Sequence, residues 1–186
     1  MIYDVGLSYL VALNWQQISW DTIKTENLTE INLQRYRGIE AAEYTGTGAV
    51  TLIGSHSNNS LIGSVGSDTL TGKFGNDTLT GGDTADSFVF NAKLDAQFNF
   101  DQITDFSTGI DKLVLDKTIF TRFTNSIQDS NLVIGMDAQD SDDYLIYDLN
   151  TQTLYYDADG SAFGTKVAFV QVVGINSLSS ADFSVI

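Results

Sequence analysis

Short apolar triplets alternate with polar segments through the middle of the chain, and the alternation repeats every nine residues. The polar segments are rich in glycine, serine, asparagine and aspartate, which turn the chain easily, and the triplets carry threonine, leucine and isoleucine, which suit strands. The pattern predicts a six-residue turn followed by a three-residue strand. Five consecutive units show it: TGTGAVTLI (45–53), GSHSNNSLI (54–62), GSVGSDTLT (63–71), GKFGNDTLT (72–80) and GGDTADSFV (81–89).

The eighth position of every unit is apolar. One unit cannot bury a single apolar side chain alone, so we expect two units to form a coil and the coils to stack. Residues 18 apart then lie one above the other, and the fold is all-β. The residues expected to form the shared interior are Leu52, Leu61, Leu70, Leu79 and Phe88.

The sixth position becomes acidic toward the C-terminal side of the repeat, where it reads Val50, Asn59, Asp68, Asp77 and Asp86. Stacking places Asp68 over Asp86 in one ladder. Asp77 lies in a second ladder on the opposite edge, between Asn59 and Asp95. Bare carboxylates in neighbouring coils, about 4.8 Å apart, repel by about 0.9 kcal/mol at the permittivity of water and roughly 3.5 kcal/mol at an effective permittivity of 20. The coils should therefore resist closing until a cation enters.

Charge and composition narrow the chemistry further. The 186 residues carry 24 Asp and Glu against 9 Lys and Arg, a formal net charge of −15 that repels nucleic acid and attracts cations. The absence of cysteine excludes disulfides and thiolate zinc sites, and the single histidine, His56, excludes paired-histidine zinc motifs and most acid–base schemes. We therefore expect no enzymatic activity.

The donor atoms of the ladders select the metal. Carboxylate and backbone carbonyl oxygens favour a hard cation, and flexible glycine turns suit the irregular shell of Ca²⁺ better than the octahedral shell of Mg²⁺. Calcium is therefore the expected cofactor. The alternative is a set of polar turns with solvated aspartates, but the acid recurs in register with both glycine and leucine, which argues for a built site.

The units resemble the G-G-x-G-x-D-x-U-x repeat of RTX, or hemolysin-type, calcium-binding proteins. GSVGSDTLT and GKFGNDTLT match closely, whereas GSHSNNSLI has Ser57 and Asn59 in the glycine and acid positions. The resemblance implies a right-handed parallel β-roll that holds calcium between successive coils through aspartates and loop carbonyls. The candidate ligands in the ladders and their turns are Gly63, Val65, Ser67, Asp68, Gly72, Phe74, Asn76, Asp77, Gly81, Asp83, Asp86 and Asp95.

The stretch from Asp101 to Asp116 resembles the D-x-I-x-D-F-x-x-G-x-D-K-x-x-L segment that follows the roll in RTX proteins. In that family the segment closes the roll and its first acids help to bind the last calcium, a role that the resemblance implies for Asp101 and Asp105. For Asp111 and Asp116 two interpretations stay open. They are further ligands, or they are solvated acids beside a strand pair with Gly109 in its turn.

Beyond Asp116 we expect a β-rich cap on the roll. Alternating apolar residues predict strands at 144–147, 153–156 and 166–173. Residues 157–161 resemble the start of a calcium loop, but Ala162 stands where an EF-hand needs glycine, so a hairpin turn is the better interpretation. The acids within 137–143 form either a solvated loop or a metal site, and a solvated loop is the preferred interpretation.

The last eight residues, 179–186, combine a candidate capping box with an acid followed by mostly apolar residues. This ending resembles the uncleaved C-terminal signals of type I secretion substrates. It also suits an edge strand of the cap, and the two roles are compatible. At the front of the chain we expect no ordinary export peptide, and no stretch approaches the roughly 20 apolar residues that span a bilayer.

Together these features predict a monomeric calcium-binding module, secreted to the extracellular space by type I secretion machinery, with no nucleic-acid partner and no transmembrane segment. Two alternatives remain: the C-terminal part of a secreted protease, lipase or glycosidase whose catalytic domain lies elsewhere, and a surface adhesion spacer.

The expected organisation divides the chain into four parts. They are an unassigned segment at 1–23, degenerate roll coils at 24–53, RTX repeats at 54–89, and a β-rich cap with the secretion signal at 90–186. A short helix or strand is expected in the first part, packed by Tyr9, Leu10, Leu13, Trp15 and Trp20.

Overall fold

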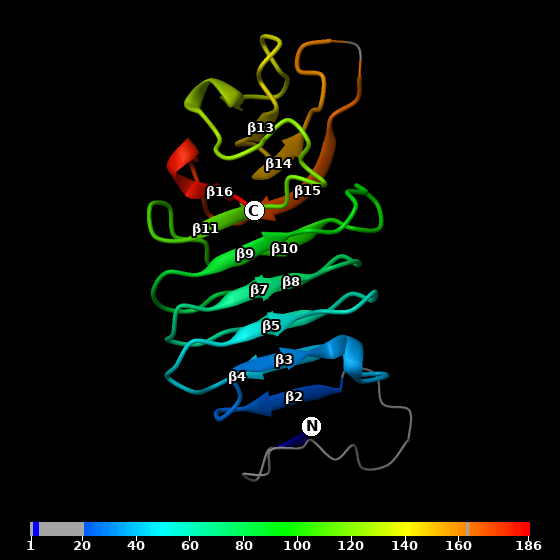
Figure 1. Cartoon of the computed structure of the whole chain (residues 1–186), viewed down its shortest axis with the longest axis vertical. Helices are drawn as coiled ribbons and strands as arrows, with labels where there is room; N and C mark the ends of the chain where they lie inside the picture. Colours follow the sequence, from blue (N-terminus) through cyan, green and yellow to red (C-terminus); the bar gives the residue numbers. More distant parts are fainter. Residues whose placement is uncertain (1, 4–20, 163) are drawn as a thin grey trace.

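The computed structural model describes residues 2–3, 21–162 and 164–186, and its strands form two sheets (Figure 1). In spatial order, the larger sheet contains β1 (Ile2–Tyr3), β2 (Thr22–Thr25), β4 (Ala41–Tyr44), β6 (Ser60–Ile62), β8 (Thr78–Thr80), β10 (Asp101–Ile103), β15 (Val167–Val172), β14 (Thr153–Tyr156), β13 (Leu145–Asp148) and β12 (Leu132–Ile134). The smaller sheet contains β16 (Phe183–Val185), β11 (Lys112–Leu115), β9 (Ser87–Phe90), β7 (Thr69–Thr71), β5 (Thr51–Ile53) and β3 (Glu30–Asn32). From β2 to β11 the chain changes sheet after every strand, so each pair of strands is one coil.

Successive coils of the repeat stack in parallel with the expected shift of 18 residues. Thr51 pairs with Thr69, and Thr69 with Ser87, in the smaller sheet. The five eighth-position residues are at most 1% exposed, so all of them point into the interior. The turn-and-strand units, two to a coil, and the all-β parallel β-roll are confirmed.

Two coils stack below the repeat. β2 pairs with β4 and β4 with β6, while β3 pairs with β5, all in parallel. Ile23, Ile31 and Ala42 are buried, so these coils continue the same apolar interior. The division of the chain at residues 23, 53 and 89 stays a prediction, and the helix or strand expected around Trp15 and Trp20 lies outside the described residues.

Above the repeat the turns lengthen. β10 pairs with β8 and β11 with β9, but the turns before them span residues 91–100 and 104–111. β15 continues the larger sheet by pairing in parallel with β10, and β16 continues the smaller sheet by pairing with β11. The C-terminal tail thus forms an edge strand, which is one of its two expected roles.

A cap containing β12 to β14, together with β15, covers the C-terminal end of the roll (Figure 1). β13, β14 and β15 pair antiparallel and lie close to the three strands that the sequence predicts. The ring of Phe169 packs edge-on against Phe90 of β9 and against Phe120, with centroids 5.2 and 5.1 Å apart. Buried aromatic pairs of this kind stabilise beyond the area they bury. They join the cap to the upper coil.

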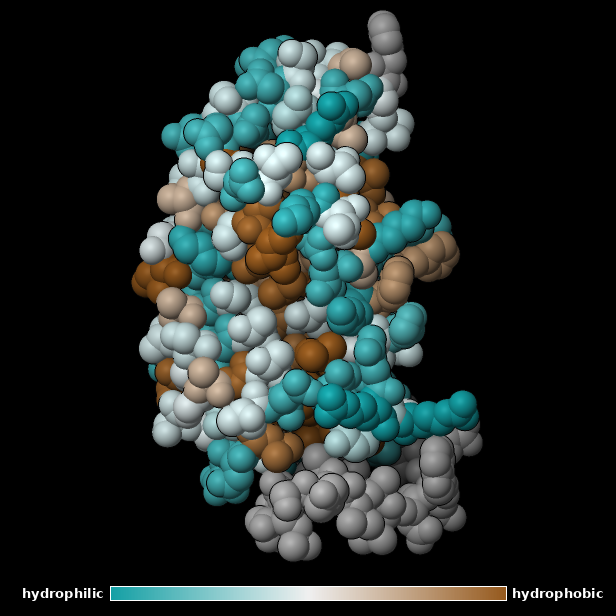
Figure 2. Space-filling model, viewed as in Figure 1, coloured by the Kyte–Doolittle hydropathy of each residue, from teal (hydrophilic) through white to brown (hydrophobic). Residues whose placement is uncertain are grey.

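Helix is confined to three short 3-10 segments in the described part of the chain: η1 (Leu33–Arg35), η2 (Asp129–Asn131) and η3 (Ser180–Asp182). Ser179 forms the expected capping box with Asp182 at the start of η3. None of these helices is long and apolar enough to cross a membrane. Figure 2 shows that the viewed face carries mostly hydrophilic or intermediate residues, with apolar residues in separate patches.

Candidate metal centre

One ladder of carboxylates runs along the edge where the chain passes from the larger sheet to the smaller. Asp68, Asp86 and Asp111 each directly precede a strand of the smaller sheet and are at most 2% exposed. One oxygen of each accepts the backbone N–H of the residue one coil below. The N–H of Val50 donates to Oδ1 of Asp68 at 2.8 Å, and the N–H of Asp68 donates to Oδ1 of Asp86 at 2.8 Å. The N–H of Asp86 donates to Oδ1 of Asp111 at 2.9 Å. The carboxylates thus help to hold neighbouring coils together.

A second ladder runs along the opposite edge. The N–H of Asn59 donates to Oδ1 of Asp77 at 2.6 Å, and the N–H of Asp77 donates to Oδ1 of Asp101 at 3.0 Å. The prediction that Asp95 takes the place above Asp77 is wrong. The coil is 24 residues long here instead of 18, and Asp95 is exposed, where its Oδ1 accepts two N–H groups of its own turn at 2.9 and 3.0 Å.

First-position glycines leave the space that the second carboxylate oxygens occupy. A Cβ atom on Gly72 would lie 2.2 Å from Oδ2 of Asp77, and a Cβ atom on Gly81 would lie 2.3 Å from Oδ2 of Asp86. Both distances are far inside van der Waals contact. The fixed spacing between glycine and aspartate in the repeat is therefore a steric requirement as well as a turn preference.

Two of these oxygens have no hydrogen-bond donor. Oδ2 of Asp77 and Oδ2 of Asp86 are buried and unpartnered among the residues that the structure describes. Oδ2 of Asp68, in contrast, accepts the N–H of Ser64 at 2.8 Å. A buried carboxylate oxygen without a donor is costly, so it favours a proton or a cation.

Burial raises the pKa of three ladder carboxyls, those of Asp77, Asp86 and Asp101, well above their ordinary value of 3.8. Loss of solvation, with the negative charge of Asp101 as the next cause, raises the pKa of Asp77 to about 8. Burial also raises the pKa of Asp86 and that of Asp101 to about 7. Without a cation these groups therefore retain protons near neutral pH.

In the presence of a chelator, the roll should lose stability as the pH rises from about 4 to about 8. The folded-state pKa values of Asp77, Asp86 and Asp101 lie above 3.8, so the folded state binds more protons than the unfolded state across this window. Urea unfolding in EDTA should give a lower midpoint at pH 8 than at pH 5. In saturating calcium the trend should reverse, because cations bind deprotonated carboxylates. A midpoint in EDTA that rises with pH would contradict this expectation.

Carboxylate and carbonyl oxygens meet beside the first-position glycines. The position of a Cβ on Gly63 lies 2.3 Å from the carbonyl oxygen of Gly81 and 2.4 Å from Oδ2 of Asp68. On the opposite edge, the position of a Cβ on Gly72 lies 2.2 Å from Oδ2 of Asp77 and 3.1 Å from Oδ2 of Asp101. Oxygen-only donors of these two kinds fit a hard cation such as calcium.

Five further predicted ligands lie in the turns, and their side chains are not part of either ladder. The side chains of Val65, Ser67, Phe74, Asn76 and Asp83 are exposed in the turns, so a contribution from their backbone oxygens stays a prediction.

Asp105 lies beside the turn that begins the unit at Gly81. Its two oxygens accept the N–H groups of Gly81 and Gly82 at 3.0 and 2.8 Å. The side chain therefore fixes the glycine turn, and its role as a metal ligand stays a prediction.

Asp111 is the ladder residue that sequence reasoning left open. It stands two residues before the buried Leu113, which is the Asp-x-apolar pattern of the repeat aspartates. This pattern in the sequence predicts a ladder position for Asp111. Asp116 lies outside both ladders, and its Oδ1 accepts the N–H and the hydroxyl of Thr118.

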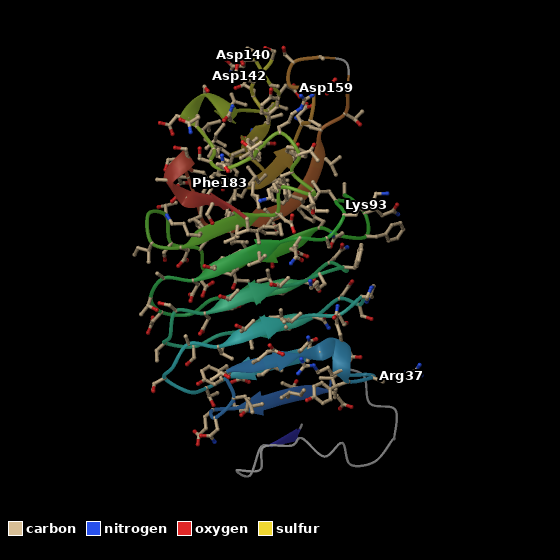
Figure 3. All side chains as sticks on the ribbon, in the orientation of Figure 1. Arg37, Lys93, Asp140, Asp142, Asp159 and Phe183 are labelled. Atoms are coloured by element: carbon tan, nitrogen blue, oxygen red, sulfur yellow. The ribbon has the colours of Figure 1, made fainter. Side chains whose placement is uncertain are left out.

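The acidic residues of the cap lie apart from the ladders. Figure 3 places Asp140, Asp142 and Asp159 at the far end of the cap. Oδ2 of Asp143 accepts the N–H groups of Gln139 and Asp140 at 2.7 and 3.0 Å. In the described ranges, no three carboxylate or imidazole side chains form a metal-binding group. A cation in the ladders would therefore need carbonyl oxygens in addition to carboxylates.

The family model described as Peptidase M10 serralysin C terminal matches residues 20–185, which is most of the chain. No curated protein matches the chain.

Proposed function

The chain belongs to the serralysin C-terminal family of peptidase M10, and on this basis we propose that it is a calcium-binding module whose roll closes when calcium binds. Domains of this family are non-catalytic RTX-type repeat modules of secreted proteins, and their repeats generally bind calcium. The observation that carries the proposal for this chain is the pair of buried, donor-free oxygens of Asp77 and Asp86.

Bound calcium would supply the positive charge that the ladders lack. Asp68, Asp77, Asp86 and Asp101 would hold it, together with carbonyl oxygens of the glycine turns. Each of these carboxylates keeps one oxygen on a backbone N–H of the coil below. That hydrogen bond fixes the side chain, and for the three repeat aspartates it leaves the second oxygen beside a glycine that has no Cβ to exclude a ligand.

The coupling of binding to folding follows from mass action. A site with a dissociation constant near 0.1 mM, in about 1 mM calcium, stabilises the folded state by about 1.4 kcal/mol. Domains are stable by only about 5–15 kcal/mol, so two such sites can decide whether a marginal roll folds. At low calcium the buried ladder carboxylates must take up protons or repel one another, and both lower the stability of the closed roll.

This behaviour suits export in an unfolded state. We propose that type I secretion machinery exports the protein through its uncleaved C-terminus, residues 179–186, and that the roll closes in the extracellular space. In cells that carry such a transporter, a chain ending at Asp182 should remain inside while the full chain appears in the medium. Equal export of the two chains would contradict the proposed role of the tail.

We propose that the chain itself has no catalytic activity and is a monomer. The description of the matched family as a peptidase C-terminal domain favours a second candidate, in which this module serves a secreted hydrolase whose catalytic domain lies elsewhere. Both candidates expect no activity from hydrolase assays on the isolated chain, and activity from these residues alone would contradict both.

Calcium titration tests the central proposal. Equilibrium dialysis should detect bound calcium, and far-ultraviolet circular dichroism should show a gain of β signal between EDTA and millimolar calcium. Magnesium at the same concentration is the matched control and should give a much smaller change. An unchanged spectrum together with no bound calcium would refute the proposal.

A further inference from the structure

Positive charge is concentrated on one edge of the roll, where the chain passes from the smaller sheet to the larger. This basic edge consists of the turns 33–40, 54–59, 72–77 and 91–100. Its cationic side chains are Arg35, Arg37, Lys73 and Lys93. The turns of the opposite edge contain no Lys or Arg and carry the acids Glu26, Asp68, Asp83, Asp86, Asp105 and Asp111. The two edges of this acidic chain therefore differ in charge.

Three of the four cations have no carboxylate partner in the part of the chain that the structure describes. Arg35 pairs with Glu30 at 2.9 Å, whereas Arg37, Lys73 and Lys93 form no ion pair there. Lys73 is half-buried, and Arg37 and Lys93 are exposed. Figure 3 shows Arg37 and Lys93 on the same side of the roll. These cations are therefore available to an anionic ligand.

Exposed aromatic rings occupy the same turns as the cations. Phe98 is 67% exposed and Phe74 is 39% exposed. The ring of His56, one coil below, stacks on that of Phe74 with centroids 5.2 Å apart. The N–H of Gly75 donates to the carbonyl oxygen of Phe98 at 3.2 Å, so the turns that carry the two phenylalanines are joined. Grouped apolar side chains with a polar rim mark an interaction surface.

We propose that the basic edge binds an anionic polysaccharide that runs along the roll. Successive coils are about 4.8 Å apart, which is close to the length of one sugar unit in an extended chain. A linear polymer can therefore place one sugar at each turn. Its acidic groups would pair with Arg37, Lys73 and Lys93, and its sugar rings would cover Phe74 and Phe98. Cations one or two coils apart match one charge per sugar better than the denser charge of a phosphate backbone.

The negative net charge of the chain does not prevent this interaction. Salt screens charges beyond about 8 Å at physiological ionic strength, so the charge of the edge itself governs a ligand bound there. The exposed acid of the edge, Asp95, is partly compensated by two N–H groups of its own turn. Calcium beside Asp77 and Asp101 would make the edge more positive. To that extent the inference rests on the proposed function.

Binding of a short oligogalacturonate, measured by isothermal titration calorimetry in calcium, tests the inference. The unmodified chain should bind it, with an affinity that falls as salt rises. Arg37→Gln combined with Lys93→Gln should lower the affinity about tenfold, because two exposed ion pairs are lost. Phe98→Ser should lower it without changing the salt dependence, because it removes apolar contact.

Thr47→Glu combined with Ala49→Glu is the matched control. It changes the net charge by the same amount on exposed residues of the opposite edge, so it should keep the affinity of the unmodified chain. Equal losses in the two double variants, or no binding of the oligosaccharide, would overturn the inference. Tighter binding of polyphosphate or of anionic lipid vesicles would also overturn it, because the edge would then serve another class of ligand.

Equilibrium dialysis with calcium separates this inference from the proposed function. A chain that binds calcium but no oligosaccharide overturns the inference and leaves the proposed function intact. A folded chain that takes up no calcium, yet binds the oligosaccharide through Arg37 and Lys93, supports the inference and refutes the proposed function.

Discussion

Asp77→Asn should stabilise the closed roll in EDTA and should remove much of its response to calcium. The amide can keep the bond from the N–H of Asn59, and its Nδ2 can donate toward the carboxylate of Asp101. Asn59 already behaves in this way at the lower end of the same ladder, where its Nδ2 donates to the carbonyl oxygen of Glu40 at 3.2 Å. The substitution therefore replaces a like-charge contact with a hydrogen bond.

The expected gain is large at high pH. Raising a pKa from 3.8 to about 8 corresponds to at most about 6 kcal/mol, because each pKa unit is worth about 1.36 kcal/mol. In urea unfolding at pH 8 in EDTA, Asp77→Asn should thus be more stable than the unmodified chain by several kcal/mol. At pH 5 the gain should shrink, because Asp77 is then protonated and carries its own donor.

Asp95→Asn is the matched control for this prediction. It makes the same change of charge on an exposed carboxylate 18 residues away in sequence, so it should leave the stability of the chain in EDTA nearly unchanged. Calcium binding separates the variants further, since only Asp77→Asn should lose affinity or one bound ion. Equal stability of the two variants in EDTA at pH 8 would show that the ladder charges do not oppose closure.

Gly72→Ala should disrupt both the upper repeat coil and calcium binding at that turn. The added Cβ would lie 2.2 Å from Oδ2 of Asp77 and 3.1 Å from Oδ2 of Asp101, in the space where carboxylate oxygens meet. Either the Asp77 side chain or the turn must move, and overpacking of this kind costs about 1–3 kcal/mol before any lost binding is counted. Calcium affinity at this turn should fall by at least about tenfold.

Gly48→Ala provides the comparison. Gly48 also lies in a turn of the roll, but its nearest neighbour to an added Cβ is the hydroxyl of Tyr44 at 3.8 Å, which is ordinary contact. This variant should fold and bind calcium like the unmodified chain. If Gly72→Ala matches Gly48→Ala in midpoint calcium concentration and in urea stability, the proposed steric link between glycine and carboxylate is wrong.

Residues with a constant spacing could be placed from the sequence. The register of Gly72, Asp77 and Leu79 recurs unit by unit, and each role is local. Glycine makes room, aspartate precedes the strand, and leucine points inward. For this reason the roll, its interior and the placing of Asp68 and Asp86 in one ladder could be predicted from the nine-residue repeat.

The nine-residue spacing does not predict the ladder positions above the repeat, where the turns are longer. Asp95 has the correct spacing for the second ladder, yet it satisfies its carboxylate with N–H groups of its own turn and stays at the surface. Asp101, which precedes the inward-facing Ile103, occupies the ladder instead. Asp111 reached the other ladder in the same manner, across 25 residues. A longer turn changes the number of residues between ladder positions. The acid that enters the ladder is the one that stands two residues before a buried apolar side chain of the next strand.

The sequence by itself determined the repeating coil and the oxygen donor atoms that favour a hard cation, because these depend on neighbours within one unit. Only the tertiary structure decided which carboxylate oxygens lose their donors, and that β15 and β16 pair with β10 and β11, strands about 70 residues earlier in the chain. Those features arise between coils and between distant segments, where burial and packing select among positions that local pattern leaves equivalent.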